Sequence, residues 1–138
     1  MFTGINHTRK EDFSVVWDLG RRCTYECSYC GPHHSNKTSP LVEIDKLKHT
    51  LDGIVKYSQL MDLYRKEPLK LDIAYTGGEP TIHPHILDIV KMCNNIGHVE
   101  LLSNGTASIT MYNTLLDYAK INISLHHELI NEKHMKKF

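Results

Sequence analysis

Residues 69–80 read LKLDIAYTGGEP and contain the clearest structural signal in the chain. Apolar and polar residues alternate from residue 69 to residue 74, which is typical of a β-strand with one buried and one solvated face. The sequence GGEP at residues 77–80 ends this pattern, because two glycines and a proline favour a turn. We therefore expect a strand over residues 69–76 that is followed by a loop.

Strand and helix patterns alternate on both sides of this stretch. Further strands are expected at residues 13–19, 99–103 and 121–125. Apolar spacings of three or four residues predict helices at residues 45–64, at residues 84–96 and after a capping Ser108, with the opening of a fourth helix at residues 128–138. Helices that connect successive strands imply a parallel sheet with right-handed crossovers, so the sequence predicts an α/β fold.

Two of the expected strands have one polar face. The alternation of residues 69–74 recurs at residues 121–126, where Asn122, Ser124 and His126 share a face. A parallel sheet that is covered on both faces normally has continuous apolar strands, so we expect helices on only one face. The polar face then lines a wet concavity, as inside an open barrel that holds a polar ligand, or is simply a solvated side of the sheet.

Residues with functional chemistry follow each expected strand at its C-terminal end. The first strand leads to three cysteines and the second to GGEP, while the third and fourth lead to Ser103-Asn104-Gly105-Thr106 and to Ser124 and His126. Parallel α/β folds collect their functional groups at this edge of the sheet. We therefore expect these segments to form one site.

Three of the four cysteines lie within eight residues, in the sequence CTYECSYC at residues 23–30. Three thiolates on one loop can hold an iron–sulfur cube of four irons and leave one iron open for a non-protein ligand. The spacing leaves two alternatives, which are a zinc site completed by His33 or His34 and a redox pair in CSYC. The remaining cysteine, Cys93, is expected to be a buried, inert thiol on a helix.

Length and composition limit the classes of function. The chain has 138 residues, which fits one domain with its own core. Lysine plus arginine and aspartate plus glutamate are equal at 16 each, so the charge gives no signal for nucleic acid or an anionic membrane. The sequence has no recognisable signal peptide and no apolar segment of membrane-spanning length. We expect a cytoplasmic protein, in which clustered thiols stay reduced and hold a metal.

Taken together, these segments resemble the radical S-adenosylmethionine (radical SAM) superfamily. CTYECSYC follows a first strand, GGEP follows a second, SNGT follows a third, and ISLH lies on a fourth. The cysteine spacing with an aromatic residue before the last cysteine is specific, and GGEP after the next strand makes it more so. The resemblance extends from about Phe13 to His127 and implies a parallel (βα) partial barrel of the radical SAM type.

The resemblance assigns roles to individual residues. It implies a 4Fe-4S cluster held by Cys23, Cys27 and Cys30, with S-adenosylmethionine chelated to the open iron. It also implies contacts to S-adenosylmethionine from Tyr29 at the adenine, from Gly77, Gly78 and Glu79 at the methionine ammonium, and from Ser103, Asn104, Ser124 and His126 at the carboxylate or ribose. The structural alternatives are a loop aromatic, a glycine turn with a capping glutamate, and an ordinary Asn-Gly turn.

The activity implied by the resemblance is reductive cleavage of S-adenosylmethionine to a 5′-deoxyadenosyl radical, which takes a hydrogen atom from a substrate. The adenosyl group carries the radical, so no protein residue is identified as catalytic. The substrate, a small molecule or a peptide, is not identified, and a reductant such as flavodoxin or ferredoxin is implied. The alternative function is a non-enzymatic zinc or iron–sulfur module on a degenerate barrel.

The chain supplies about four strand–helix units, fewer than the full barrel of the family. Residues 1–138 are therefore interpreted as a radical SAM core that is incomplete at its C-terminus, without the family's apolar, glycine-containing motif on a later strand. The chain is interpreted as the N-terminal piece of a longer protein, as one part of an assembly, or as a shortened homologue. The first interpretation is favoured, because the last residues end inside an expected helix without a capping signal.

Overall fold

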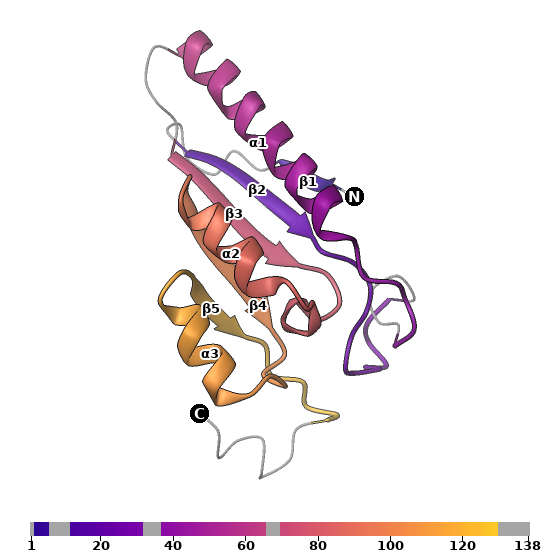
Figure 1. Cartoon of the computed structure of the whole chain (residues 1–138). Coiled ribbons are helices and arrows are strands. Elements are labelled where there is room, and N and C mark those ends of the chain that lie inside the picture. Colours follow the sequence, from indigo (N-terminus) through magenta and orange to yellow (C-terminus); the bar gives the residue numbers. More distant parts are fainter. Residues whose placement is uncertain (1, 6–11, 32–36, 66–69, 130–138) are drawn as a thin grey trace.

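A computed structural model describes residues 2–5, 12–31, 37–65 and 70–129 (Figure 1). The elements in chain order are β1 (Phe2–Ile5), β2 (Asp12–Asp18), α1 (Ile44–Arg65), β3 (Lys70–Thr76), the short 3₁₀-helix η1 (Pro80–Ile82), α2 (Ile86–Asn94), β4 (His98–Ser103), α3 (Ile109–Leu116) and β5 (Lys120–Ile123). The four expected strands and three of the expected helices are confirmed, and Ser108 caps α3 by accepting from the Met111 amide. Residues 130–138, most of the expected fourth helix, lie outside the described residues.

The strands form one sheet in the order β1-β2-β3-β4-β5. The four strands from β2 to β5 are parallel, as the sequence predicts, and consecutive neighbours are joined by helical crossovers. The registers align Asp18 with Thr76 and Ser103 with Ile123, which brings their C-terminal ends to a common edge.

Strand β1 was not predicted from the sequence. It pairs with β2 in the antiparallel direction. Its sequence, FTGI, has only four residues and includes a glycine, which weakens strand propensity. The formation of β1 therefore depends more on pairing with β2 than on its own residue pattern.

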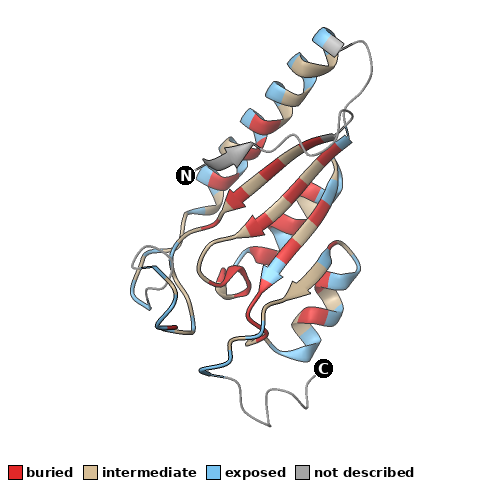
Figure 2. Ribbon diagram, turned by 180° about the vertical axis from the view of Figure 1, so that it is seen from behind, coloured by how far each residue is buried: buried red, intermediate tan, exposed pale blue. Residues whose placement is uncertain are grey.

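The three α-helices lie on the same face of the sheet (Figure 1). Figure 2, which is viewed from the opposite side, shows the sheet in front of the helices. Leu71, Ile73 and Tyr75 of β3 are buried, whereas the alternate residues Asp72 and Ala74 are only partly buried. This confirms that helices cover the apolar face and leave the other face as a candidate ligand-facing surface.

Cys93 lies on the buried side of α2 and belongs to the core. It is fully buried together with Ile86 and Val90, and the hydroxyl of Tyr75 donates a hydrogen bond to its sulfur at 2.6 Å. Burial raises the pKa of the Cys93 thiol to about 11. The thiol is therefore protonated near neutral pH, as expected for an inert core cysteine.

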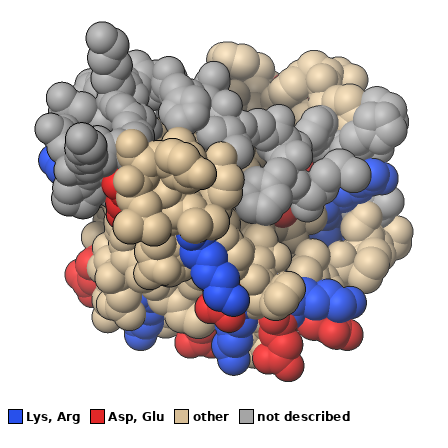
Figure 3. All heavy atoms as spheres, turned by 90° about the horizontal axis from the view of Figure 1, so that it is seen from above, with Lys and Arg blue, Asp and Glu red and all other residues tan. Residues whose placement is uncertain are grey.

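Acidic and basic side chains are interspersed on the face of the molecule seen in Figure 3. Exposed pairs on and just before α1 illustrate this mixing, with Lys46 facing Glu43 and Lys48 facing Asp45. Such exposed pairs contribute little to stability. None of the helices in the described ranges is long and apolar enough to cross a membrane.

Two adjacent leucines of β4 test the one-sided packing. Leu101 is fully buried under the helices, whereas Leu102 on the opposite face is 46% exposed. Replacing Leu101 with alanine should lower the free energy of unfolding by about 2 to 5 kcal/mol, because it leaves a cavity in the core. Replacing Leu102 with alanine should cost less than about 1 kcal/mol. Equal losses for the two variants in urea unfolding would contradict the assignment of the faces.

Candidate functional site

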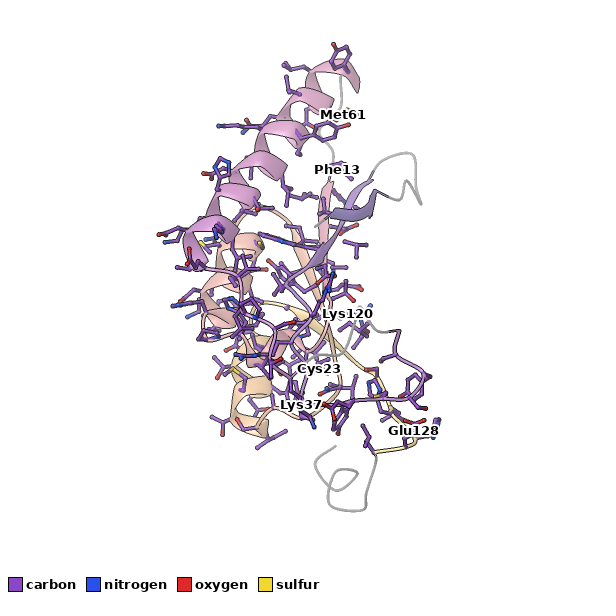
Figure 4. All side chains as sticks on the ribbon, turned by 90° about the vertical axis from the view of Figure 1, so that its right-hand side faces the viewer. Phe13, Cys23, Lys37, Met61, Lys120 and Glu128 are labelled. Carbon is purple, nitrogen blue, oxygen red and sulfur yellow. The ribbon has the colours of Figure 1, made fainter. Side chains whose placement is uncertain are left out.

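A cavity of about 190 Å³ lies at the C-terminal edge of the parallel strands. Its lining is contributed by the cysteine loop and by the ends of β3, β4 and β5, namely Cys23, Tyr25, Cys27, Cys30, Thr76, Gly77, Gly78, Leu102, Ser103, Asn104, Ser124 and His126. Every expected site residue except Tyr29 and Glu79 therefore lines this cavity. Figure 4 shows Cys23 and Glu128 at the end of the molecule away from Phe13, which lies near the start of β2.

The glycines that follow β3 pack against the chain segment leading to Cys23. The amide of Gly78 donates to the carbonyl of Gly20 at 2.7 Å, and the amide of Glu79 donates to the carbonyl of Arg22 at 2.8 Å. A Cβ on Gly77, whose φ is 123°, would come 2.5 Å from the Gly20 oxygen, and a Cβ on Gly78 would overlap the Arg22 carbonyl. Side-chain-free residues are therefore required here for the protein's own backbone packing.

The carboxylate of Glu79 joins η1 to the end of β4. It is 2% exposed and accepts hydrogen bonds from the amide and hydroxyl of Thr81 at 3.0 and 2.5 Å. It also accepts from the hydroxyl of Ser103 at 2.8 Å and from the amide of Asn104 at 2.6 Å. The structure thus places Glu79 behind the cavity wall, and its contact with a ligand ammonium stays a prediction.

The end of β4 forms the expected Asn-Gly turn, with Gly105 at a φ of 78°. The hydroxyl of Ser103 lies 2.7 Å from the hydroxyl of Tyr112 as well as contacting Glu79. The side chain of Asn104 reaches across to the cysteine loop, where its Nδ2 lies 3.0 Å from Thr24 Oγ1. Both predicted residues therefore line the cavity, but the Ser103 hydroxyl is bound to Glu79 and Tyr112, whereas the Asn104 side chain is bound to the cysteine loop.

The imidazole of His126 lies over the cysteine loop. Its Nδ1 is 3.2 Å from the sulfur of Cys27 and 2.6 Å from the hydroxyl of Tyr29, and its Nε2 is 2.8 Å from Ser124 Oγ. The rings of Tyr29 and His126 are stacked with centroids 5.9 Å apart, and the ring of Tyr25 meets the same imidazole in a T-shaped arrangement. Tyr29, which is 58% exposed, therefore covers His126 from outside and does not line the cavity.

A second contact joins the cysteine loop to the segment after β5. The amide of Ser28 donates to Glu128 Oε2 at 2.9 Å, and its hydroxyl donates to Glu128 Oε1. These hydrogen bonds lower the pKa of the Glu128 carboxyl. The contacts of His126 and Glu128 connect residues about 100 positions apart and fix the mouth of the cavity.

The sequence did not identify three residues of the lining. Thr76 shares a strand face with Asp72 and Ala74, so continuing the alternation of β3 could have found it. Leu102 lies on the corresponding face of β4 and also lines the cavity, but an apolar residue gives no functional signal. Tyr25 lies between two cysteines, and no spacing rule distinguishes its orientation from that of its neighbours.

The donor set bears on which metal group fits the cavity. Burial and the neighbouring Cys27 raise the pKa of the Cys30 thiol, so binding a metal there would displace the proton of Cys30. Within the described ranges, no three side chains of His, Cys, Asp or Glu are arranged to hold one metal ion. Three thiolates around one cavity fit a cube, in which each binds a different iron, better than they fit a tetrahedral zinc site. His33 and His34, the expected zinc ligands, lie outside the described residues.

The structure places three loop cysteines at the C-terminal edge of four parallel strands. A family model described as the Radical SAM superfamily matches residues 17–138. The chain belongs to this superfamily, which confirms the resemblance recognised in the motifs and the partial-barrel fold.

Two relatives with known names match this chain. It is 29% identical over 91 residues to 7,8-dihydro-6-hydroxymethylpterin dimethyltransferase of Methanocaldococcus jannaschii. The matched region is 64% of this chain and 16% of that relative. It is 30% identical over 112 residues to Molybdenum cofactor biosynthesis protein 1 of Bos taurus. The matched region is 78% of this chain and 16% of that relative. The chain therefore spans about 16% of the length of each of these relatives.

The network around Glu79 is testable by an isosteric change. Replacing Glu79 with glutamine should lower the free energy of unfolding by about 2 kcal/mol, because one carboxylate oxygen becomes an amide that faces N–H or O–H donors. The matched change at the exposed Glu43 should cost less than about 0.5 kcal/mol. Urea unfolding of the metal-free proteins measures both, and an unchanged Glu79→Gln protein would show that the network is not stabilising.

Proposed function

We propose that this chain binds a 4Fe-4S cluster through Cys23, Cys27 and Cys30 and binds S-adenosylmethionine at the open iron. The observation that carries the proposal is the shared cavity, which is lined by the three cysteines and by residues at the ends of three further strands. Membership of the radical SAM superfamily supports the same cofactors. When bound, they would supply reductive cleavage of S-adenosylmethionine and hydrogen abstraction from a substrate.

The protein's part in this chemistry is to bind, orient and shield. Thr76 and Ser124 contribute polar groups to the same cavity as Gly77 and Gly78, beside which the cofactor's charged methionine end would lie. The described cavity of about 190 Å³ is smaller than the roughly 300 to 1,000 Å³ typical of ligand pockets. His126 closes one side of it, so we infer that this imidazole moves off Cys27 when the cofactors bind and then contacts S-adenosylmethionine.

We further propose that residues 1–138 form the first part of a radical SAM core whose barrel is completed by additional strands. The described β5 is the last strand of the sheet order, and an open strand edge is a ready partner for another strand. The substrate, a small molecule or a peptide, would be selected by parts beyond this region. A reductant such as flavodoxin or ferredoxin would supply the electron for reductive cleavage, and a cytoplasmic location would keep the thiols reduced.

The ligand set is tested by single replacements of cysteine. Changing Cys23, Cys27 or Cys30 to alanine should abolish retention of the cluster after anaerobic reconstitution, because each thiolate binds one iron. Changing Cys93 to alanine should leave retention intact, because its buried sulfur lies in the core and not in the cavity. Iron and sulfide analysis with visible absorbance measures both outcomes. Zinc in place of iron, or cluster loss in the Cys93 variant, would contradict the proposed ligand set.

Cleavage of S-adenosylmethionine is a separate test. The reconstituted chain should form 5′-deoxyadenosine when S-adenosylmethionine and dithionite are added, and the Cys30→Ala variant should form none. Chromatography of the quenched reaction measures the product. A fully loaded cluster that yields no 5′-deoxyadenosine would contradict the cleavage reaction for this chain while leaving cluster binding in place.

A further inference from the structure

The side-chain amide of Asn104 has one orientation that satisfies its neighbours. Its Oδ1 accepts from the backbone amide of Thr106 at 3.1 Å and from the Thr106 hydroxyl at 2.7 Å. A backbone N–H can only donate, so the oxygen of Asn104 has to face Thr106 and the nitrogen has to face the other way. The Nδ2 group then points at Thr24 Oγ1, at 3.0 Å, and at the sulfur of Cys23, at 3.6 Å.

This amide is held in place by contacts on several sides. Asn104 is 6% exposed, and its own backbone N–H donates to the carboxylate of Glu79 at 2.6 Å. The hydroxyls of Thr24 and Thr106 are 3.0 Å apart and close the ring of hydrogen bonds around the amide. The oxygen and the nitrogen of the Asn104 side chain therefore both have hydrogen-bond partners within the protein. The amide is better placed to donate to a cysteine sulfur than to bind a diffusible ligand.

The sulfur of Cys23 receives two N–H groups. One is the backbone amide of Tyr25 at 3.4 Å, which comes from the same loop, and the other is the Asn104 amide from the end of β4. Hydrogen bonds to cluster sulfurs draw electron density from the thiolate and favour the more negative, reduced cluster. The Asn104 contact is the one of these two that a side-chain replacement can remove.

We propose that Asn104 is a positioning residue that raises the reduction potential of the cluster through its hydrogen bond to Cys23. The couple concerned is the one-electron reduction of the cluster, in which the reductant is oxidised and no bond forms or breaks. This assignment rests on the proposed cluster function. It gives Asn104 a sulfur partner in place of the methionine carboxylate or ribose that the family resemblance implies.

Two replacements distinguish the role of Asn104 as a hydrogen-bond donor to Cys23 from its role in the turn. In Asn104→Ser the hydroxyl can still accept from the Thr106 amide two residues on, but it is too short to reach Cys23. In Asn104→Asp the shape is kept and an oxygen replaces the donor. The matched control is Asn113→Ser, because Asn113 is exposed on α3 and is absent from the cavity lining.

The readout is the midpoint potential of the reconstituted cluster in a dithionite titration followed by electron paramagnetic resonance. Asn104→Asp should shift the reduction equilibrium about tenfold toward the oxidised cluster, which is about 59 mV for a one-electron couple. Asn104→Ser should shift it in the same direction by roughly threefold, and Asn113→Ser should leave it unchanged. Potentials for both Asn104 variants equal to that of the unmodified chain would overturn the proposal, although cluster binding would stand.

A measurement on the unmodified chain keeps the test decisive if a variant fails to hold its cluster. Labelling only the side-chain amides of asparagine with ¹⁵N should give a ¹⁵N coupling in the pulsed electron paramagnetic resonance of the reduced cluster. The Asn113→Ser protein should retain that coupling. Absence of the coupling in a cluster-loaded chain would refute the hydrogen bond, whereas a chain that takes up no iron–sulfur cluster would refute the proposed function itself.

Discussion

The carboxylate of Glu79 and the backbone beside it hold together the segments that build the cavity. The amide of Glu79 binds the segment before Cys23, while its carboxylate binds η1 and the end of β4. A buried carboxylate is stable only when its acceptors are satisfied, and four donors satisfy this one. The position of the cysteine loop relative to Ser103 and Asn104 therefore depends on Glu79 as well as on the direct contact of Asn104 with Thr24.

The contacts at the mouth of the cavity are more exposed than the contacts of Glu79 with the end of β4. The contacts of Ser28 with Glu128, and of Tyr29 with His126, lie at or near the surface. Exposed hydrogen bonds compete with water and contribute less than buried, charge-assisted ones. The proposed function requires the mouth to open while the sheet ends keep their geometry, and the contacts that such an opening would break are these weaker, exposed ones.

The candidate site was largely readable from local motifs, and the exceptions have physical reasons. The motifs identified Cys23, Asn104 and His126, because residues after parallel strands share one edge of the sheet. They could not show that the Glu79 carboxylate is buried against Ser103 and Asn104, or that Tyr29 lies outside the cavity lining, since both depend on which partner each side chain meets. Leu102 stayed undetected because an apolar residue carries no chemical signature.

The sequence alone determined the order of strands and helices, the parallel sheet and the family, because hydrophobic periodicity and cysteine spacing are local properties of the chain. Only the tertiary structure decided that β1 joins the sheet and that Gly77 and Gly78 make room for Gly20 and Arg22. It also decided that the Asn104 amide is aimed at Cys23, 81 residues away. These features are contacts between distant segments, and such contacts exist only after the chain has folded.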